Sequence, residues 1–318
     1  MAEHFADRLL EAVEGKGSPA AVALDPVADR LPSELKGNSP AGSDLDPSAA
    51  LESILRFGRR VIEIVAPLVP VIKINSAYFE CLGPQGTRGY LELVHAARRA
   101  GTIVIGDVKR GDVGHSAQMY AQAHLGGAKI DGLDESIAPD AITVSGYFGA
   151  DGVTPFIDAA KPRGQGVFVL VRTSNPTAAD IQDIRAEDGR SMHEIVAGEV
   201  ARWAADPATI GGLGMSSVGA VVATREREDA ARLRSLLPRS ILLVPGYGAQ
   251  GGHAEDFAPY FDRSGRGALV AAGRSVIFAY EEESYRSRFG ADWEKCIAAA
   301  CEDFVRRIAS VAQGRSSP

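Results

Sequence analysis

The residues best suited to chemistry lie in the segment GDVKRGDVGHS, residues 106–116. Asp107 and Lys109 are two residues apart on a predicted strand, so their side chains share one face. Asp112 follows a glycine, where the strand has already turned, and Lys73 ends an earlier apolar segment. Together these four residues can form a chain of alternating charge. Carboxylates on each side keep a lysine protonated, and such a lysine in a dry pocket can donate a proton to a carbanion. A buried ion-pair network without catalytic function is the alternative interpretation.

A second candidate is the glycine-rich segment GYGAQGG, which matches Gly-x-Gly-x-x-Gly at Gly246, Gly248 and Gly251. It is a poor dinucleotide-binding fingerprint, because it opens no long helix and belongs to no clear βαβ unit with a partner acid. Backbone N–H groups of such a loop can hold a phosphate, with Arg274 supplying charge and Gln250 a side-chain donor. Glycines that serve only tight turns are the alternative.

These residues need a scaffold, and the sequence predicts one made of parallel strands. Eight short runs rich in Val and Ile recur along the chain, and they are continuous rather than alternating, as in strands buried on both faces. The predicted strands span residues 20–25, 69–75, 102–109, 140–146, 166–174, 218–224, 240–246 and 267–273.

Helical patterns lie between these strands, and the charged N-terminus also reads as a short amphipathic helix. The other predicted helices span residues 48–66, 89–100, 115–124, 191–205, 225–237 and 292–311. This alternation predicts an α/β fold with one closed (β/α)₈ TIM barrel over residues 1–318. An open doubly wound sheet is the competing architecture.

Three connections are longer than a simple barrel needs, at residues 28–47, 126–139 and 175–189. Long loops in a compact fold often act as lids or binding loops. For the first two, a tolerated surface insertion is an equally good interpretation.

Polar residues cluster where the apolar strands end. In a barrel these ends meet at one rim, the catalytic face, and buried charges are costly unless they are paired or used. The residues at these ends are Asp25, Lys73, Asn75, Asp107, Lys109, Thr173, Ser174, Gly246–Gly252, Gly273, Arg274 and Ser275.

Composition limits the possible partners. The chain has 34 Lys and Arg against 41 Asp and Glu, a formal net charge of -7. This balance argues against nonspecific binding to nucleic acid or to an anionic membrane, but it allows a basic pocket for one phosphate. No apolar run approaches the roughly 18 to 20 residues of a membrane span, and no signal peptide is visible. Three cysteines without a Cys-x-x-Cys pair favour free thiols in a reducing cytoplasm.

The sequence carries no recognised motif for a metal or for a nucleophilic serine. The six histidines show no ligand spacing. Asp107 and Asp112 could serve a divalent metal, but the two lysines compete for the same carboxylates. We therefore expect no metal.

The Asp-x-Lys-x-x-Asp element at Asp107, Lys109 and Asp112, with Lys73 one strand earlier, resembles orotidine 5′-phosphate decarboxylase. FVLVRTSNP (168–176) and LVPGYGAQGG (243–252) are very close to the longer bacterial branch of that family. The similarity extends from about Ala20 to Arg274 and covers every strand end. It implies a dimeric barrel that converts orotidine 5′-phosphate to UMP and carbon dioxide without a cofactor.

The resemblance also implies roles for single residues. Lys109 should protonate C6 of the pyrimidine, and Asp107 should face the substrate carboxylate. Asp112 should reach across a homodimer into the partner's site, with Ser116 near the same ribose. The remaining implied contacts are Asp25 and Lys73 to ribose hydroxyls, Ser174 to the pyrimidine, Gln250 to base and phosphate, and Gly273 and Arg274 to the phosphate.

Departures from the family pattern leave this chemistry intact. Ser116 stands where threonine is usual and Val113 where isoleucine is usual, while Ser145 and Gly146 replace a more frequent Asn-Pro pair.

Two rival functions stay open. One is a magnesium-dependent sugar-phosphate decarboxylase or aldolase with the same Asp-x-Lys-x-x-Asp element, and the other is a catalytically idle nucleotide-binding protein.

Overall fold

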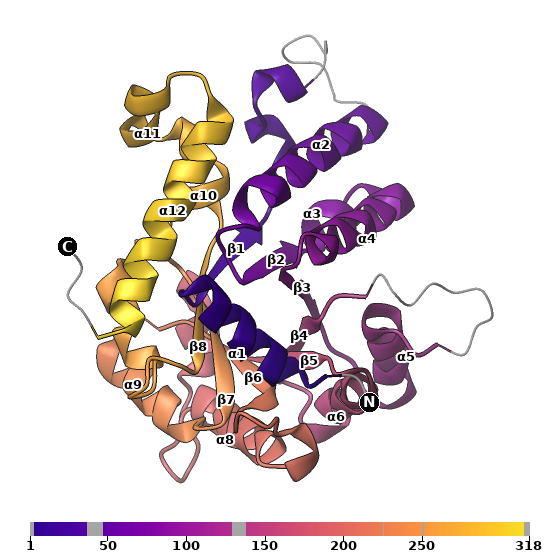
Figure 1. Ribbon diagram of the computed structural model, residues 1–318. Coiled ribbons are helices and arrows are strands. Elements are labelled where there is room, and N and C mark those ends of the chain that lie inside the picture. The colour runs from indigo at the N-terminus through magenta and orange to yellow at the C-terminus, as the bar shows by residue number, and fades with distance from the viewer. Residues whose placement is uncertain (1–2, 37–46, 129–137, 225, 250, 315–318) are drawn as a thin grey trace.

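The computed structural model describes residues 3–36, 47–128, 138–224, 226–249 and 251–314. Its centre is a closed barrel of eight parallel strands in which each strand pairs with the next and β8 pairs with β1 (Figure 1). The strands are β1 (Ala20–Leu24), β2 (Val71–Asn75), β3 (Ile103–Arg110), β4 (Ala141–Ser145), β5 (Gly166–Arg172), β6 (Ser216–Val222), β7 (Ser240–Pro245) and β8 (Ala268–Ala272). All eight predicted strands are confirmed, and the open doubly wound sheet is wrong.

Helices surround the barrel and explain why its strands are apolar throughout. Outward-facing strand residues pack under the helices, while inward-facing ones fill the barrel, so both faces are buried. The surrounding helices are α2 (Pro47–Val65), α3 (Ala77–Glu80), α4 (Gly83–Arg99), α5 (Gly114–Leu125), α6 (Ala150–Ala160), α7 (Ala179–Gln182), α8 (Met192–Ala204), α9 (Arg227–Leu236), α10 (Arg274–Ile277), α11 (Glu283–Phe289) and α12 (Trp293–Ala312).

Helix α1 (Phe5–Lys16) closes one end of the barrel. It lies across the ring of strands in Figure 1, and its apolar residues join the cluster that fills the barrel interior. Phe5 meets Phe168 of β5 edge-on with ring centroids 6.0 Å apart. A Cβ on Gly166 would lie 2.3 Å from the Phe5 ring, so the close approach of α1 requires glycine there. This end is therefore sealed, and the site must open at the other.

The structure differs from the sequence prediction between β4 and β5. Helix α6 was not predicted there, because its sequence contains Gly152 and Pro155 and lacks a clear start signal.

The predicted 175–189 loop also holds regular structure, a 3₁₀ turn (Pro176–Ala178) followed by α7. Residues 37–46 of the first long connection and 129–137 of the second lie outside the described residues.

The described start of the first long connection is docked on the C-terminal part of the chain. The Arg30 guanidinium lies 3.9 Å from the centre of the Phe278 ring and pairs with Glu281. Trp293 donates a hydrogen bond to Glu34. This segment therefore flanks the end of the barrel at which β8 finishes.

Candidate active site

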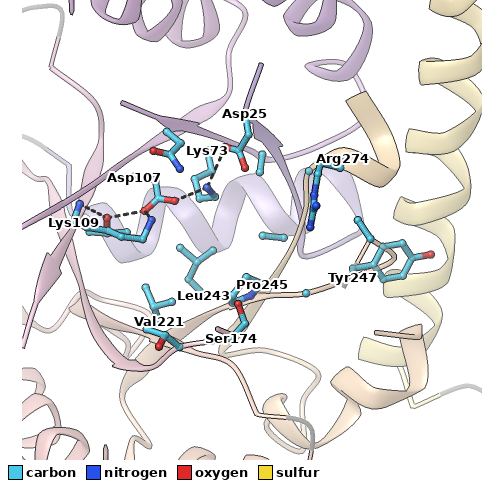
Figure 2. Close-up of a pocket in the computed structure, with 18 of the residues that line it drawn as sticks. Asp25, Lys73, Asp107, Lys109, Ser174, Val221, Leu243, Pro245, Tyr247 and Arg274 are labelled. Carbon is cyan, nitrogen blue, oxygen red and sulfur yellow. Dashed lines mark hydrogen bonds and ion pairs between the residues drawn. The ribbon is translucent and has the colours of Figure 1, made fainter. Parts of the chain in front are cut away.

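The carboxyl ends of the strands surround one open cavity of about 240 Å³. Charged side chains lie on one side of it and apolar side chains on the other, as Figure 2 shows. The lining residues are Ala23, Asp25, Lys73, Asn75, Asp107, Lys109, Thr143, Leu170, Thr173, Ser174, Val221, Leu243, Pro245, Gly246, Tyr247, Ala249, Ala271, Gly273 and Arg274. Most of the strand-end residues singled out from the sequence therefore converge.

The charged side of the cavity is a chain of ion pairs centred on Asp107. Lys73 Nζ lies 2.6 Å from Asp107 Oδ2, and Lys109 Nζ lies 2.7 Å from Asp107 Oδ1. Asp25 Oδ1 is 3.6 Å from Lys73 Nζ, and this oxygen is buried without a hydrogen bond. Three members of the predicted chain are thus in contact, and Asp25 extends it toward β1.

Burial and charge act in opposite directions on this chain. Burial would raise the pKa of Asp107, but the ammonium groups of Lys73 and Lys109 outweigh it and hold the pKa well below its usual range. Burial would likewise lower the pKa of Lys73, and Asp25 and Asp107 together raise it instead. Asp107 is therefore ionised and Lys73 charged at neutral pH.

Lys109 differs from Lys73 in its access to the cavity. The side chain of Lys73 is 9% exposed, whereas that of Lys109 is 48% exposed. Lys73 is therefore a buried cation in the cavity wall, while the Lys109 ammonium contacts Asp107 and remains accessible from the cavity. This arrangement suits Lys109 for proton donation.

Thr143 of β4 is a member of the charged cluster that no pattern in the sequence singles out. Its hydroxyl donates to Asp107 Oδ1 at 2.9 Å and accepts the Lys109 backbone N–H at 2.9 Å. Threonine is common in strands, so nothing in the run AITVS distinguishes it from an ordinary strand residue. Only the pairing of β4 with β3 places it beside the charges.

An apolar wall faces the charge chain across the cavity. Leu170, Val221, Leu243, Pro245 and Ala271 supply it from four neighbouring strands. In Figure 2 the side chains of Val221 and Leu243 lie below the Lys73–Asp107 pair. A ligand in this cavity would therefore meet charged groups on one side and apolar groups on the other.

The glycine-rich segment and Arg274 form another edge of the cavity (Figure 2). Gly248 has φ +68°, and a Cβ there would meet the Ser275 side chain at 2.6 Å, so the turn requires glycine. Within the described part of the chain, no acidic side chain forms an ion pair with Arg274. Its charge is therefore available to an anion. Gln250 lies outside the described residues.

Ser174 reaches the cavity from the segment after β5. That segment is tied to its strand by Gln182, which accepts a hydrogen bond from the Thr173 backbone N–H and donates one to the Thr173 hydroxyl. The short helix α7 thus holds the end of β5 in place beside Ser174.

A family model described as "Orotidine 5'-phosphate decarboxylase / HUMPS family" matches residues 45–289. The chain belongs to this family. The resemblance inferred from the sequence is therefore confirmed, and the match includes β2 to β8 with nearly all the cavity residues.

Relatives within the orotidine 5′-phosphate decarboxylase / HUMPS family match over almost their whole length. An orotidine 5′-phosphate decarboxylase from Rhodopirellula baltica is 39% identical over 93% of this chain and 96% of its own. One from Clostridium tetani is 34% identical over 96% and 99%. The crystal structure of a candidate orotidine 5′-phosphate decarboxylase from Streptomyces avermitilis is 31% identical, with a TM-score of 0.77 over 98% of this chain and 97% of its own.

The two residues that the resemblance assigns to the partner's site, Asp112 and Ser116, do not line the cavity of their own chain. Asp112 is absent from its lining, and its Oδ1 accepts a hydrogen bond from the next backbone N–H, that of Val113, at 2.8 Å. Ser116 is exposed on the first turn of α5. Both lie beyond the strand end that holds Asp107 and Lys109, as the sequence pattern predicted.

Over the described ranges, no group of three or more His, Cys, Asp or Glu side chains is arranged to hold a metal ion. None of the described helices combines the length and the apolar character needed to cross a membrane.

Proposed function

We propose that this protein decarboxylates orotidine 5′-phosphate to UMP and carbon dioxide in pyrimidine biosynthesis, acting in the cytoplasm without a metal or cofactor. The observation that carries the proposal is the ionised Asp107 carboxylate held between two lysines, one buried and one open to the cavity. Membership of the family makes orotidine 5′-phosphate the substrate that this site fits best.

The reaction breaks the bond between C6 of the pyrimidine and its carboxylate carbon, and carbon dioxide leaves without the bonding electrons. The electron pair stays on C6, and Lys109 donates a proton to it. A cation already in position where this charge develops lowers the barrier without reorganisation of solvent. The neutral amine of Lys109 then regains a proton from solvent as product leaves.

Asp107 has two roles in this scheme. It orients the Lys109 ammonium through the 2.7 Å contact, and it places a negative charge near the substrate carboxylate. That repulsion is relieved when carbon dioxide departs, which favours the transition state over the bound substrate. Lys73 keeps Asp107 ionised from the other side.

The rest of the substrate binds along the other edges of the cavity. Arg274 and Gly273 hold the phosphate, and Gln250 bridges phosphate and base. Asp25, whose Oδ1 is buried without a hydrogen bond, accepts from a ribose hydroxyl beside Lys73. Ser174 forms a hydrogen bond with the edge of the pyrimidine, and the apolar wall packs against the face of the pyrimidine ring. Binding energy from the phosphate holds the reacting end against Asp107.

We further propose that the active unit is a homodimer in which Asp112 and Ser116 complete the partner's site. Asp112 is absent from the lining of its own cavity, and large apolar side chains are exposed on α5 and on the segments that follow β3 and β4. These exposed residues are Val113, Met119, Tyr120, Tyr147 and Phe148. An apolar surface of this kind beside a charged residue fits a subunit interface.

The contacts of Asp107 favour this function over a magnesium-dependent sugar-phosphate reaction. Oδ2 receives Lys73, and Oδ1 receives both Lys109 and the Thr143 hydroxyl. A metal at this carboxylate would have to compete with two ammonium groups that already contact it. The lysines instead make the carboxylate part of a proton-donating site.

The test is to incubate the purified protein with orotidine 5′-phosphate in the presence of EDTA and to measure UMP and carbon dioxide. We expect one molecule of each product per substrate consumed and the same rate without EDTA. UMP binding without turnover would identify an idle nucleotide-binding protein. Loss of activity with EDTA and its return with magnesium would overturn the metal-free mechanism.

A further inference from the structure

The strand that carries Asp107 and Lys109 is irregular just where these residues occur. Gly106 of β3 pairs with Ile142 of β4, and the next registered pair is Arg110 with Val144. Residues 107–109 of β3 therefore face a single residue of β4, Thr143. Such a bulge bends the strand and changes the direction of its side chains.

The bulge places Lys109 in an unfavourable backbone conformation. Its φ is +45°, and it is the one residue other than glycine with a positive φ in the described part of the chain. A left-handed conformation in a lysine costs free energy, so its surroundings must hold it there. The bulge also takes the Lys109 N–H out of the regular strand ladder, which leaves it in need of another acceptor.

Thr143 meets both needs with one hydroxyl. Oγ1 accepts the Lys109 N–H and donates its own proton to Asp107 Oδ1, each at 2.9 Å. These directions follow from the donors available, because Asp107 is ionised and can only accept. The Thr143 residue is 1% exposed, so no solvent competes for the hydroxyl.

We propose that Thr143 is the positioning residue that aims the Lys109 ammonium in the reaction proposed above. It stabilises the left-handed turn at Lys109 and fixes the Asp107 oxygen on which the ammonium rests. Its hydroxyl is engaged by the Lys109 N–H and by Asp107 Oδ1, so it acts on the reaction through these two residues. Loss of the Thr143 hydroxyl should therefore slow the chemical step and should hardly change the affinity for the nucleotide.

The test compares Thr143→Val with Thr143→Ser. Valine keeps the shape and burial of threonine but removes the hydroxyl, whereas serine keeps the hydroxyl. Thr102→Val is the matched control, because Thr102 is also buried, has one hydrogen bond through its hydroxyl, and lies before β3 at the opposite rim.

For Thr143→Val we expect kcat to fall by about 30- to 100-fold, the loss typical of a small displacement of a catalytic group. KM and the Kd for UMP should change by less than about threefold. Thr143→Ser and Thr102→Val should each keep kcat within about threefold of the unmodified protein. Rescue by serine distinguishes positioning through the hydroxyl from simple packing.

The proposal is overturned if Thr143→Val keeps kcat within about threefold, or if Thr143→Ser loses as much as Thr143→Val. If Thr143→Val does not fold, Thr143→Ala replaces it, and equal kcat values for the Ala and Ser variants overturn the proposal. An unmodified protein that forms no UMP refutes the proposed function instead. In that case a crystal structure of Thr143→Val tests the positioning role. If Lys109 keeps its φ and its contact with Asp107 in that structure, the positioning role is contradicted.

Discussion

The Asp107 carboxylate is the residue on which the proposed chemistry depends most. Burial opposes its ionisation, yet the ammonium groups of Lys73 and Lys109 hold it ionised, and the Thr143 hydroxyl donates a third hydrogen bond. Removing any one donor leaves a buried charge less well satisfied, and such losses are larger than those of surface pairs. Effects of single substitutions in this cluster will therefore not be additive.

We predict that Lys109→Ala abolishes turnover and leaves UMP binding largely intact. The ammonium acts at C6, whereas UMP carries no carboxylate to meet it and is held by its phosphate and ribose. We expect kcat to fall by at least about 10³-fold, because the variant loses the proton donor and also the cation placed where negative charge develops on C6. Turnover and UMP titration by calorimetry measure the two effects.

Lys295→Ala is the control for Lys109→Ala, because Lys295 is an exposed lysine on α12 that pairs with Asp292. It should leave both measurements unchanged. Decarboxylation by Lys109→Ala within about tenfold of the unmodified rate would remove Lys109 from the role of proton donor.

Arg274 gives a second prediction at this scale. Arg274→Ala should weaken UMP binding by about 2 to 5 kcal/mol, the cost of removing one partner of a desolvated charge pair. Uridine, which has no phosphate, should bind the variant and the unmodified protein equally. Calorimetry with both ligands checks this, and Arg286→Ala on α11 serves as an exposed arginine outside the cavity lining. Equal losses for UMP and uridine would show that Arg274 is structural.

At the scale of elements, the end of β3 is anchored to two helices. Arg110 pairs with Glu80 of α3 and donates to His124 Nε2 of α5 at 3.1 Å. It also donates to the Val108 carbonyl at 3.0 Å. These bonds hold the strand just past Lys109, so the position of the bulge in β3 depends on α3 and α5 as well as on β4.

This anchor should make stability depend on pH. Burial, with a smaller contribution from the Arg110 charge, lowers the pKa of His124 from 6.5 to about 4. Between these values the unfolded chain binds a proton that the folded chain does not. The contribution of His124 to the free energy of unfolding should therefore be complete above pH 6.5 and should be lost as the pH decreases toward 4.

Urea unfolding from pH 7 to pH 4 tests the prediction on His124. The comparison is with His124→Gln, which can still accept from Arg110 but does not titrate. The unmodified protein should lose more free energy of unfolding over this range than the variant does. Parallel profiles would mean that His124 is protonated equally easily in the folded and unfolded chain.

At the scale of the whole molecule, α1 closes one end of the barrel and the cavity opens at the other. We propose that residues 1–318 form this one barrel domain. The loops after β3 and β4 carry exposed apolar side chains next to Asp112 and Ser116. An interface there would place the two cavities of a dimer near the shared surface.

We predict that two inactive variants restore activity when their subunits exchange. In a mixed dimer of Lys109→Ala and Asp112→Ala, one site collects both changes and the other regains an intact Lys109 and Asp112. Random exchange makes half of the dimers mixed, with one good site in each, so about a quarter of the unmodified activity should return. The assay is UMP formation after exchange, with mixed dimers verified by differently tagged subunits. No activity in verified mixed dimers would place Asp112 in its own chain's site.

The sequence by itself determined the architecture and most of the charged site. Continuous apolar runs alternating with amphipathic helices indicate parallel strands covered by helices, because each pattern is a local consequence of burial on two faces or one. This pattern favoured a barrel over an open doubly wound sheet, and the pairing of β8 with β1 shows the closure. Asp107 and Lys109 could be assigned together because a regular strand places residues two apart on one face. The two side chains do meet, but β3 is bulged at this point and Lys109 has a positive φ, so a regular strand does not set their directions. Asp25, Lys73 and Arg274 followed because strand ends in a barrel meet at one rim.

The tertiary structure alone decided how these groups are held. Thr143 is an ordinary strand residue in sequence, and only the register of β4 against the bulged β3 brings its hydroxyl between Asp107 and Lys109. Helix α6 forms despite Gly152 and Pro155, because packing against the barrel outweighs local propensity. Hydrogen bonds and pKa shifts depend on distances through space between separate strands, and these are not encoded in any local pattern of residues.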